Sequence, residues 1–118
     1  MEWQPTTAEV AAYRRATGCP VLRVLPTLQA MSAELRQRVL IAVKSQESPL
    51  HDPIEDDSHL GPLVRQASAE AEQLAVAQGR RGMGTCHLIW HETARILRES
   101  HRVEWFSPAQ MNPDVFFD

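Results

Sequence analysis

Residues 79–102, GRRGMGTCHLIWHETARILRESHR, decide the fold of this chain. A turn rich in glycine and arginine runs directly into the longest regular apolar pattern of the sequence. With Thr85 as N-cap and a rotation of about 100° per residue, one side of a helix collects Cys86, Ile89, Trp90, Thr93, Ile96, Leu97 and Ser100. Spacings of three and four residues predict an amphipathic helix over 85–101 whose apolar stripe packs on a core.

The opposite side of this helix is cationic or able to become so, and it carries His87, His91, Arg95, Arg98 and Arg102. His87 and His91 are four residues apart, which makes them neighbours on a helix surface and able to bind one metal ion. The helical zinc-protease motif needs a glutamate directly after its first histidine, and Leu88 stands there, so we exclude a metalloprotease. A solvated polar face with two ordinary histidines is the alternative interpretation.

The turn before this helix has the composition of an anion site. Its glycines permit close backbone approach and positive φ angles. A helix N-terminus offers unpaired N–H groups, and arginines pair with phosphate or carboxylate. The residues of such an anion or nucleotide site are predicted to be Arg80, Arg81, Gly82, Gly84, Thr85 and Arg98. A P-loop is excluded because its spacing and its Lys-Ser/Thr pair are missing, and a plain loop in which Gly79 ends the preceding helix is the alternative.

An acidic stretch over 45–59 is predicted to form a long loop. Its histidines and acids are ligand types that a divalent metal accepts, although no known spacing such as that of the EF-hand is present. One hypothesis therefore joins His51, Asp52 and His59 to His87 and His91 in a divalent metal site. The alternatives are a solvated acidic loop, a loop paired with the arginine face, or a mobile loop that docks on a basic partner.

The remaining chain predicts further helices. A capping box at Thr6 and Glu9 begins a helix over 7–17, and other apolar patterns predict helices over 27–45 and 60–78. Prolines bracket residues 20–26, which we expect to form an extended linker. The stretch Val39–Val43 is apolar nearly all round, which fits a central bundle helix or a homo-oligomer interface.

The sequence after residue 102 predicts a short helical turn and an aromatic tail. Ser107, Pro108 and Gln110 have the pattern of a helix start, and Asn112-Pro113-Asp114 that of a turn. Large rings at 105, 106, 116 and 117 are expected to wrap the helices, and docking of the tail on another chain is the alternative. The fold is therefore predicted to be all-α: a compact irregular four-helix bundle with a wrapping aromatic tail, in a single domain over 1–118. A bundle completed only in a dimer is the alternative.

Composition narrows the classes of function. A net charge of −3 argues against a general nucleic-acid binder. Cys19 and Cys86 form no disulfide framework or metal spacing, and no leader or membrane-spanning pattern is present, so we expect a cytoplasmic protein without a membrane partner.

Residues 82–118 resemble part of a group of small bacterial proteins of unknown function. The shared pattern is Cys86-His87, Trp90, Ile96-Leu97, Trp105, Ser107-Pro108-Ala109, Asn112-Pro113 and Phe117-Asp118. The resemblance implies a small, stand-alone bacterial protein and assigns no activity and no residue role.

No catalytic set is complete, so the sequence leaves open whether this protein is an enzyme. We expect a non-enzymatic interaction or regulatory module that binds a protein partner or itself. The alternatives are the metal protein and the anion or nucleotide binder described above.

Overall fold

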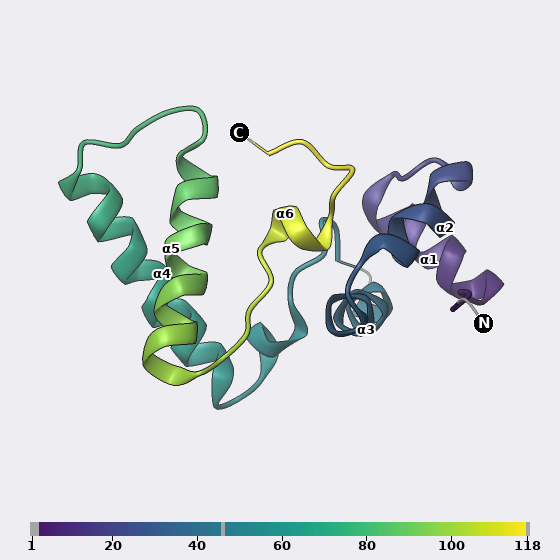
Figure 1. Cartoon of the computed structure of the whole chain (residues 1–118), viewed down its shortest axis with the longest axis horizontal. Coiled ribbons are helices and arrows are strands. Elements are labelled where there is room, and N and C mark those ends of the chain that lie inside the picture. The colour runs from purple at the N-terminus through teal and green to yellow at the C-terminus, as the bar shows by residue number, and fades with distance from the viewer. Residues whose placement is uncertain (1–2, 46, 118) are drawn as a thin grey trace.

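The computed structural model describes residues 3–45 and 47–117, and within them it contains helices and no strand (Figure 1). The elements are α1 (Thr7–Thr17), α2 (Val21–Ala30), α3 (Ala33–Ala42), the 3-10 helices η1 (Val43–Ser45) and η2 (Pro53–Asp56), α4 (Leu60–Ala77), α5 (Thr85–His101) and α6 (Pro108–Met111). The all-α prediction is confirmed. The predictions that include Met1, Glu2, Gln46 and Asp118 lie outside the described residues at those positions.

Three helices occur where the sequence places them. The capping box of α1 is present, since the Thr6 hydroxyl accepts from the Glu9 N–H and the Glu9 carboxylate from the Thr6 N–H. The start of α4 is held by Asp57, whose carboxylate accepts from the N–H groups of His59 and Leu60. These two bonds lower the pKa of Asp57. Local capping chemistry therefore sets both helix starts.

The prediction for residues 20–26 is wrong, and the helix expected over 27–45 is present only in part. Residues 21–30 form α2 instead of an extended linker, and the expected helix over 27–45 breaks between Ala30 and Ala33. Ser32 causes the break, because its hydroxyl accepts from the Leu35 N–H at 3.2 Å and starts a new helix. Pro26 is tolerated inside α2 because the bond it removes leaves only the carbonyl of Leu22 unpaired, and Leu22 is exposed to water.

The helices pack in two clusters. The first joins α1, α2 and α3 around buried side chains that include Tyr13, Leu28 and Val39. The second is the hairpin of α4 and α5, where Ala67 and Ala71 pack against Ile96 and Leu97. Small alanine side chains let the two long helices approach closely.

The apolar stretch predicted as a possible interface is largely used inside the chain. Val39, Ala42 and Val43 are buried in the first cluster, and Ile41 remains 48% exposed. Burial within the monomer accounts for most of this pattern, and self-association stays a prediction.

The segment after α5 links the two clusters. Trp105 belongs to the hairpin cluster, whereas Phe106 and Met111 belong to the first cluster. Figure 1 shows α6 between the α4–α5 hairpin and α1–α3. Phe117 lies on Trp90 of α5, and Phe116 is 84% exposed. Within the described residues, no helix is both long and apolar enough to cross a bilayer.

Candidate functional site

An open groove of about 760 Å³ follows the polar face of α5. One wall is α5 with its C-cap residue, through His87, Trp90, His91, Ala94, Arg98 and, at the cap, Arg102. The other is the returning chain, through Val103, Glu104, Trp105, Phe106, Ser107 and Gln110. The spacing of the α5 residues places them on one side of a helix, so a single element presents two histidines and two arginines along the groove.

The end of α5 produces this groove by reversing the chain. Arg102 adopts a left-handed conformation with φ of 55°. The N–H of Arg102 donates to the carbonyl of Arg98 at 3.2 Å, the bond of an αL helix end, and the N–H of Val103 donates to the carbonyl of Leu97 at 3.0 Å. The chain therefore leaves α5 toward α6 and forms the second wall.

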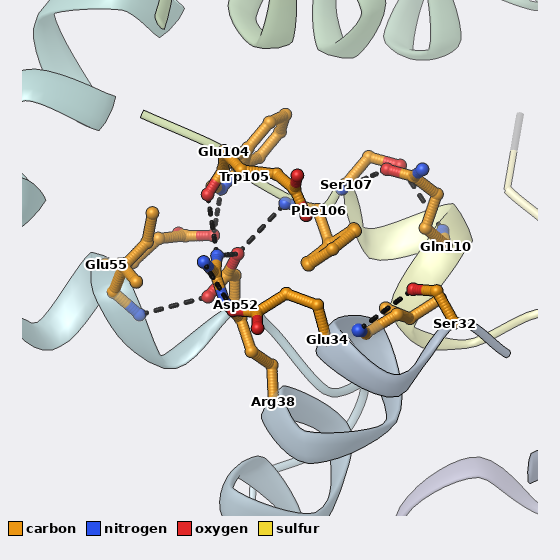
Figure 2. Close-up of polar contacts among 12 residues, drawn as sticks. Ser32, Glu34, Arg38, Asp52, Glu55, Glu104, Trp105, Phe106, Ser107 and Gln110 are labelled. Carbon is orange, nitrogen blue, oxygen red and sulfur yellow. Dashed lines mark hydrogen bonds and ion pairs between the residues drawn. The ribbon is translucent and has the colours of Figure 1, made fainter. Parts of the chain in front are cut away.

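The buried carboxylate of Asp52 holds this second wall in place (Figure 2). It accepts from Arg38 Nη1 at 2.7 Å and from the Phe106 N–H at 2.9 Å, so it joins α3 to the returning chain. Arg38 Nη1 also donates to the carbonyl of Glu104 at 2.6 Å. Trp105 donates through Nε1 to Glu55 at 2.9 Å. The acidic loop thus holds the second wall of the groove through its contacts with Trp105 and Phe106.

Charge is distributed unevenly over the molecule. Residues 79–102 carry five arginines and two glutamates, a formal charge of +3, while the rest of the chain carries −6. Both glutamates of this region, Glu92 and Glu99, pair with Arg95. Within the described part of the chain Arg98 and Arg102 form no ion pair, and Glu104 is the one acid among the lining residues. The groove is therefore a cationic site with unneutralised arginines.

Four of the six residues predicted for the anion site line a second hollow at the start of α5. It measures about 500 Å³ and is lined by Arg80, Arg81, Met83, Gly84, Thr85, His87, Leu88 and His91. Gly82 does not line it, but with Gly84 it supplies the positive φ angles, 86° and 85°, that the turn requires. Arg98 instead lines the larger groove. His87 and His91 border both hollows, which makes the two sites neighbours on one helix face.

Phe117 packs against α5 beside the groove. His87 Nε2 lies 3.0 Å from the carbonyl oxygen of Phe117 and is placed to donate to it. The rings of Phe117 and Trp90 meet edge to face with centroids 5.2 Å apart, and His87 and Trp90 meet likewise at 5.3 Å. The Phe117 side chain thus lies at the N-terminal end of the polar face of α5.

The structure does not bring the predicted metal ligands together. His51 pairs with Glu47 and Asp56, Asp52 is bonded to Arg38, and His59 is exposed at the start of α4. Figure 1 shows the loop before α4 at the end of the hairpin away from the start of α5. Across residues 3–45 and 47–117, no group of three or more His, Cys, Asp or Glu side chains is arranged to hold a metal ion.

Cys19 is unsuited to nucleophilic chemistry. Cys19 is buried, and burial, followed by the hydrogen bond to Asp114, raises the pKa of its thiol to about 11. A thiol with such a pKa holds almost no thiolate at neutral pH. Burial also raises the pKa of the neighbouring Tyr13.

Sequence reasoning located one wall of the groove and missed the other. The histidines and arginines of α5 were visible from helical spacing. The contribution of Trp105, Ser107 and Gln110 carried no local signal, because it depends on the direction in which the chain leaves α5. The structural role of Asp52 was missed for the same reason.

Comparison with known proteins gives no match: no protein-family model, no curated protein and no solved structure aligns significantly with the chain. The resemblance of residues 82–118 to small bacterial proteins of unknown function stays a prediction.

Proposed function

We propose that this protein is a binding module that holds an acidic segment of a protein partner in the groove along α5. The observation that carries this proposal is the row of His87, His91, Arg98 and Arg102 on one groove wall, with arginines that no acid of the described chain neutralises. Arginine forms two parallel hydrogen bonds with a carboxylate. Trp90 and Trp105 add aromatic surface in the same groove.

Two physical effects favour an acidic segment over a neutral one. The net charge of the chain is −3, so an acidic partner is repelled except near residues 79–102, where the charge is positive. This contrast steers association to the groove and suppresses other docking positions. The groove is open to solvent rather than enclosed, which suits a chain segment better than a small molecule that must be buried.

A binding experiment tests the proposal. A fluorescein-labelled peptide of aspartate and glutamate is titrated with the wild-type protein and followed by anisotropy at low salt. The double change Arg98→Glu and Arg102→Glu should weaken binding at least about tenfold, because each exposed charge pair contributes on the order of 1 kcal/mol. Arg14→Glu with Arg15→Glu, on the exposed side of α1, is the matched control.

The two pairs of variants separate groove binding from general attraction. If both pairs weaken binding equally, the peptide responds to net charge alone and the groove is not the site. Binding should also weaken as salt is added, since exposed charges are screened. A peptide that does not bind wild-type protein at low salt contradicts the proposal.

The hollow at the glycine-rich turn supports a second candidate, the binding of a small phosphate-bearing ligand. Arg80 and Arg81 line it together with Gly84 and Thr85 at the N-terminus of α5, where no side chain caps the helix. Thermal melting with inorganic phosphate and with nucleotides tests this candidate, since a ligand that binds the folded state raises the melting temperature. Arg80→Ala with Arg81→Ala should abolish the rise, and no rise in wild-type protein contradicts it.

A further inference from the structure

The tail segment, residues 113–117, already places an aromatic ring at the binding face of α5. Phe117 contacts Trp90 through its ring, and its carbonyl oxygen lies at hydrogen-bond distance from His87. Both α5 residues line the groove. The sequence PDVFFD at 113–118 combines aromatic and acidic side chains, which is the chemistry that a cationic, aromatic-lined groove attracts.

This ring is held by few contacts. Asp114 is tied to Arg23 by an ion pair, and the Val115 N–H donates to the carbonyl of Asn112, so the chain is anchored up to residue 115. Beyond it, Phe116 is 84% exposed, and Phe117 contacts His87 and Trp90. A ring attached after a firm anchor and held by two surface contacts can leave its position without unfolding the helices.

We propose that Phe117 is a built-in competitor at the groove, and that the acidic partner segment carries an aromatic residue that takes the place of Phe117 on Trp90 and His87. The inference rests on the proposed function and specifies the partner: a protein segment in which an aromatic residue stands next to acidic ones. Because Phe117 occupies the position in the same molecule, the affinity of the partner is reduced by the fraction of molecules in which the ring is in place.

The test uses two neighbouring phenylalanines as a matched pair. Fluorescein-labelled PDVFFD is titrated by anisotropy into wild-type protein, Phe117→Ala and Phe116→Ala. The peptide should bind Phe117→Ala about fivefold more tightly than wild type, the change expected when one competing ring contact is removed. Phe116→Ala should bind like wild type, since Phe116 is exposed. Circular dichroism melting checks that both variants are folded, and Phe117→Leu gives a second variant with a smaller cavity.

Two altered peptides separate the ring from the charges. A PDVAAD peptide should lose the gain on Phe117→Ala, because it has no ring for the vacated position. Equal affinity of wild type, Phe116→Ala and Phe117→Ala for PDVFFD overturns the inference, as does equal binding of PDVAAD and PDVFFD to Phe117→Ala.

The outcomes also distinguish this inference from the proposed function. Suppose that PDVAAD still binds through Arg98 and Arg102 while Phe117→Ala leaves the affinity for PDVFFD unchanged. The proposed binding of acidic segments in the groove is then supported, and the role of Phe117 as a competitor is contradicted. If PNVFFN binds as well as PDVFFD, the aromatic position on Trp90 and His87 is supported, and recognition of acidic side chains by the groove is contradicted. A wild-type dimer in light scattering that becomes a monomer in Phe117→Ala makes a second copy the occupant and overturns the partner segment.

Discussion

At the scale of single residues, two buried polar side chains connect the parts of this molecule. Asp52 bonds to Arg38 of α3 and to the backbone of Phe106. Asn112 accepts from the N–H of Leu50 at 2.8 Å and donates to its carbonyl at 2.7 Å. Both side chains are fully buried. A buried polar group without its partner costs about 1–3 kcal/mol, so these contacts specify where the returning chain lies.

Arg38 offers a direct comparison of a buried and an exposed ion pair. It contacts Asp52, whose side chain is 0% exposed, and Glu34, whose side chain is 52% exposed. Asp52→Ala should lower the free energy of unfolding by about 3 kcal/mol, because it leaves Arg38 and the Phe106 N–H without their buried acceptor. Glu34→Ala should lower it by about 0.5 kcal/mol or less. Urea unfolding measures both, and similar losses for the two variants would contradict the role of Asp52.

At the scale of elements, close backbone approach sets the position of α4. Its buried alanines face α5, and Gly61 in its first turn lies against η2. A Cβ atom added at Gly61 would stand 2.5 Å from the carbonyl oxygen of Glu55. Real Cβ atoms do not approach a backbone oxygen so closely, so η2 and the start of α4 must separate if a larger residue is introduced.

In Gly61→Ala two effects therefore oppose each other: the higher helix propensity of alanine stabilises the fold, and the steric conflict with η2 destabilises it. Alanine is favoured over glycine in a helix by about 1 kcal/mol. The steric conflict with Glu55 should nonetheless lower the free energy of unfolding by about 1–3 kcal/mol. Gln66→Ala, at an exposed position of α4, is the control and should change it by about 0.5 kcal/mol or less. Thermal or urea unfolding decides, and a stabilised Gly61→Ala would show that the contact with η2 relaxes freely.

At the scale of the whole molecule, the acidic loop and the returning chain join two helix clusters into a body of 46 × 31 × 26 Å. His51 fastens the loop, with Nδ1 at 2.8 Å from Glu47 and Nε2 at 3.0 Å from Asp56. Burial lowers the pKa of His51, but the hydrogen bond with Asp56 and the charges of Glu47, Asp56 and Glu55 outweigh it and raise the pKa above its ordinary value. Two acidic partners at the two ring nitrogens require the protonated imidazole.

This arrangement predicts a pH-dependent contribution to stability. Because the folded pKa of His51 is raised, its contribution is complete below the ordinary histidine value and is lost as the pH rises through the folded value. His51→Gln should therefore destabilise the protein most near about pH 5.5 and least near about pH 9. Urea unfolding of both proteins across this range measures the difference. A difference between the two proteins that does not change with pH would contradict the role of His51.

Much of the local structure followed from the sequence. Helical spacing predicted α1, α4 and α5, and hydrogen bonds to the side chains of Thr6 and Asp57 hold the starts of α1 and α4. Thr85 was expected to be the N-cap of α5, but it is the first helical residue and Gly84 is the N-cap. Spacing also identified the histidine and arginine face of α5, because residues three and four apart on a helix must share a side. These features depend on contacts within a few residues, which a linear pattern records. The break at Ser32 was also local, but a continuous apolar pattern across it obscured the cap.

The tertiary structure alone decided what stands opposite α5. The groove exists because the chain reverses at Arg102 and is then fixed by Asp52 and Asn112, whose partners lie 54 and 62 residues away in the sequence. The tertiary structure also places the acidic loop away from His87 and His91. The residue types had suggested that the loop and these two histidines bind one metal ion together. By itself the sequence determined an all-α chain with a cationic helix face, since those properties arise from short-range periodicity. Whether that face binds a metal, lies in solvent or lines a groove depends on contacts between residues far apart in the sequence, above all the burial of polar groups. The spacing of residues along one helix does not encode such contacts.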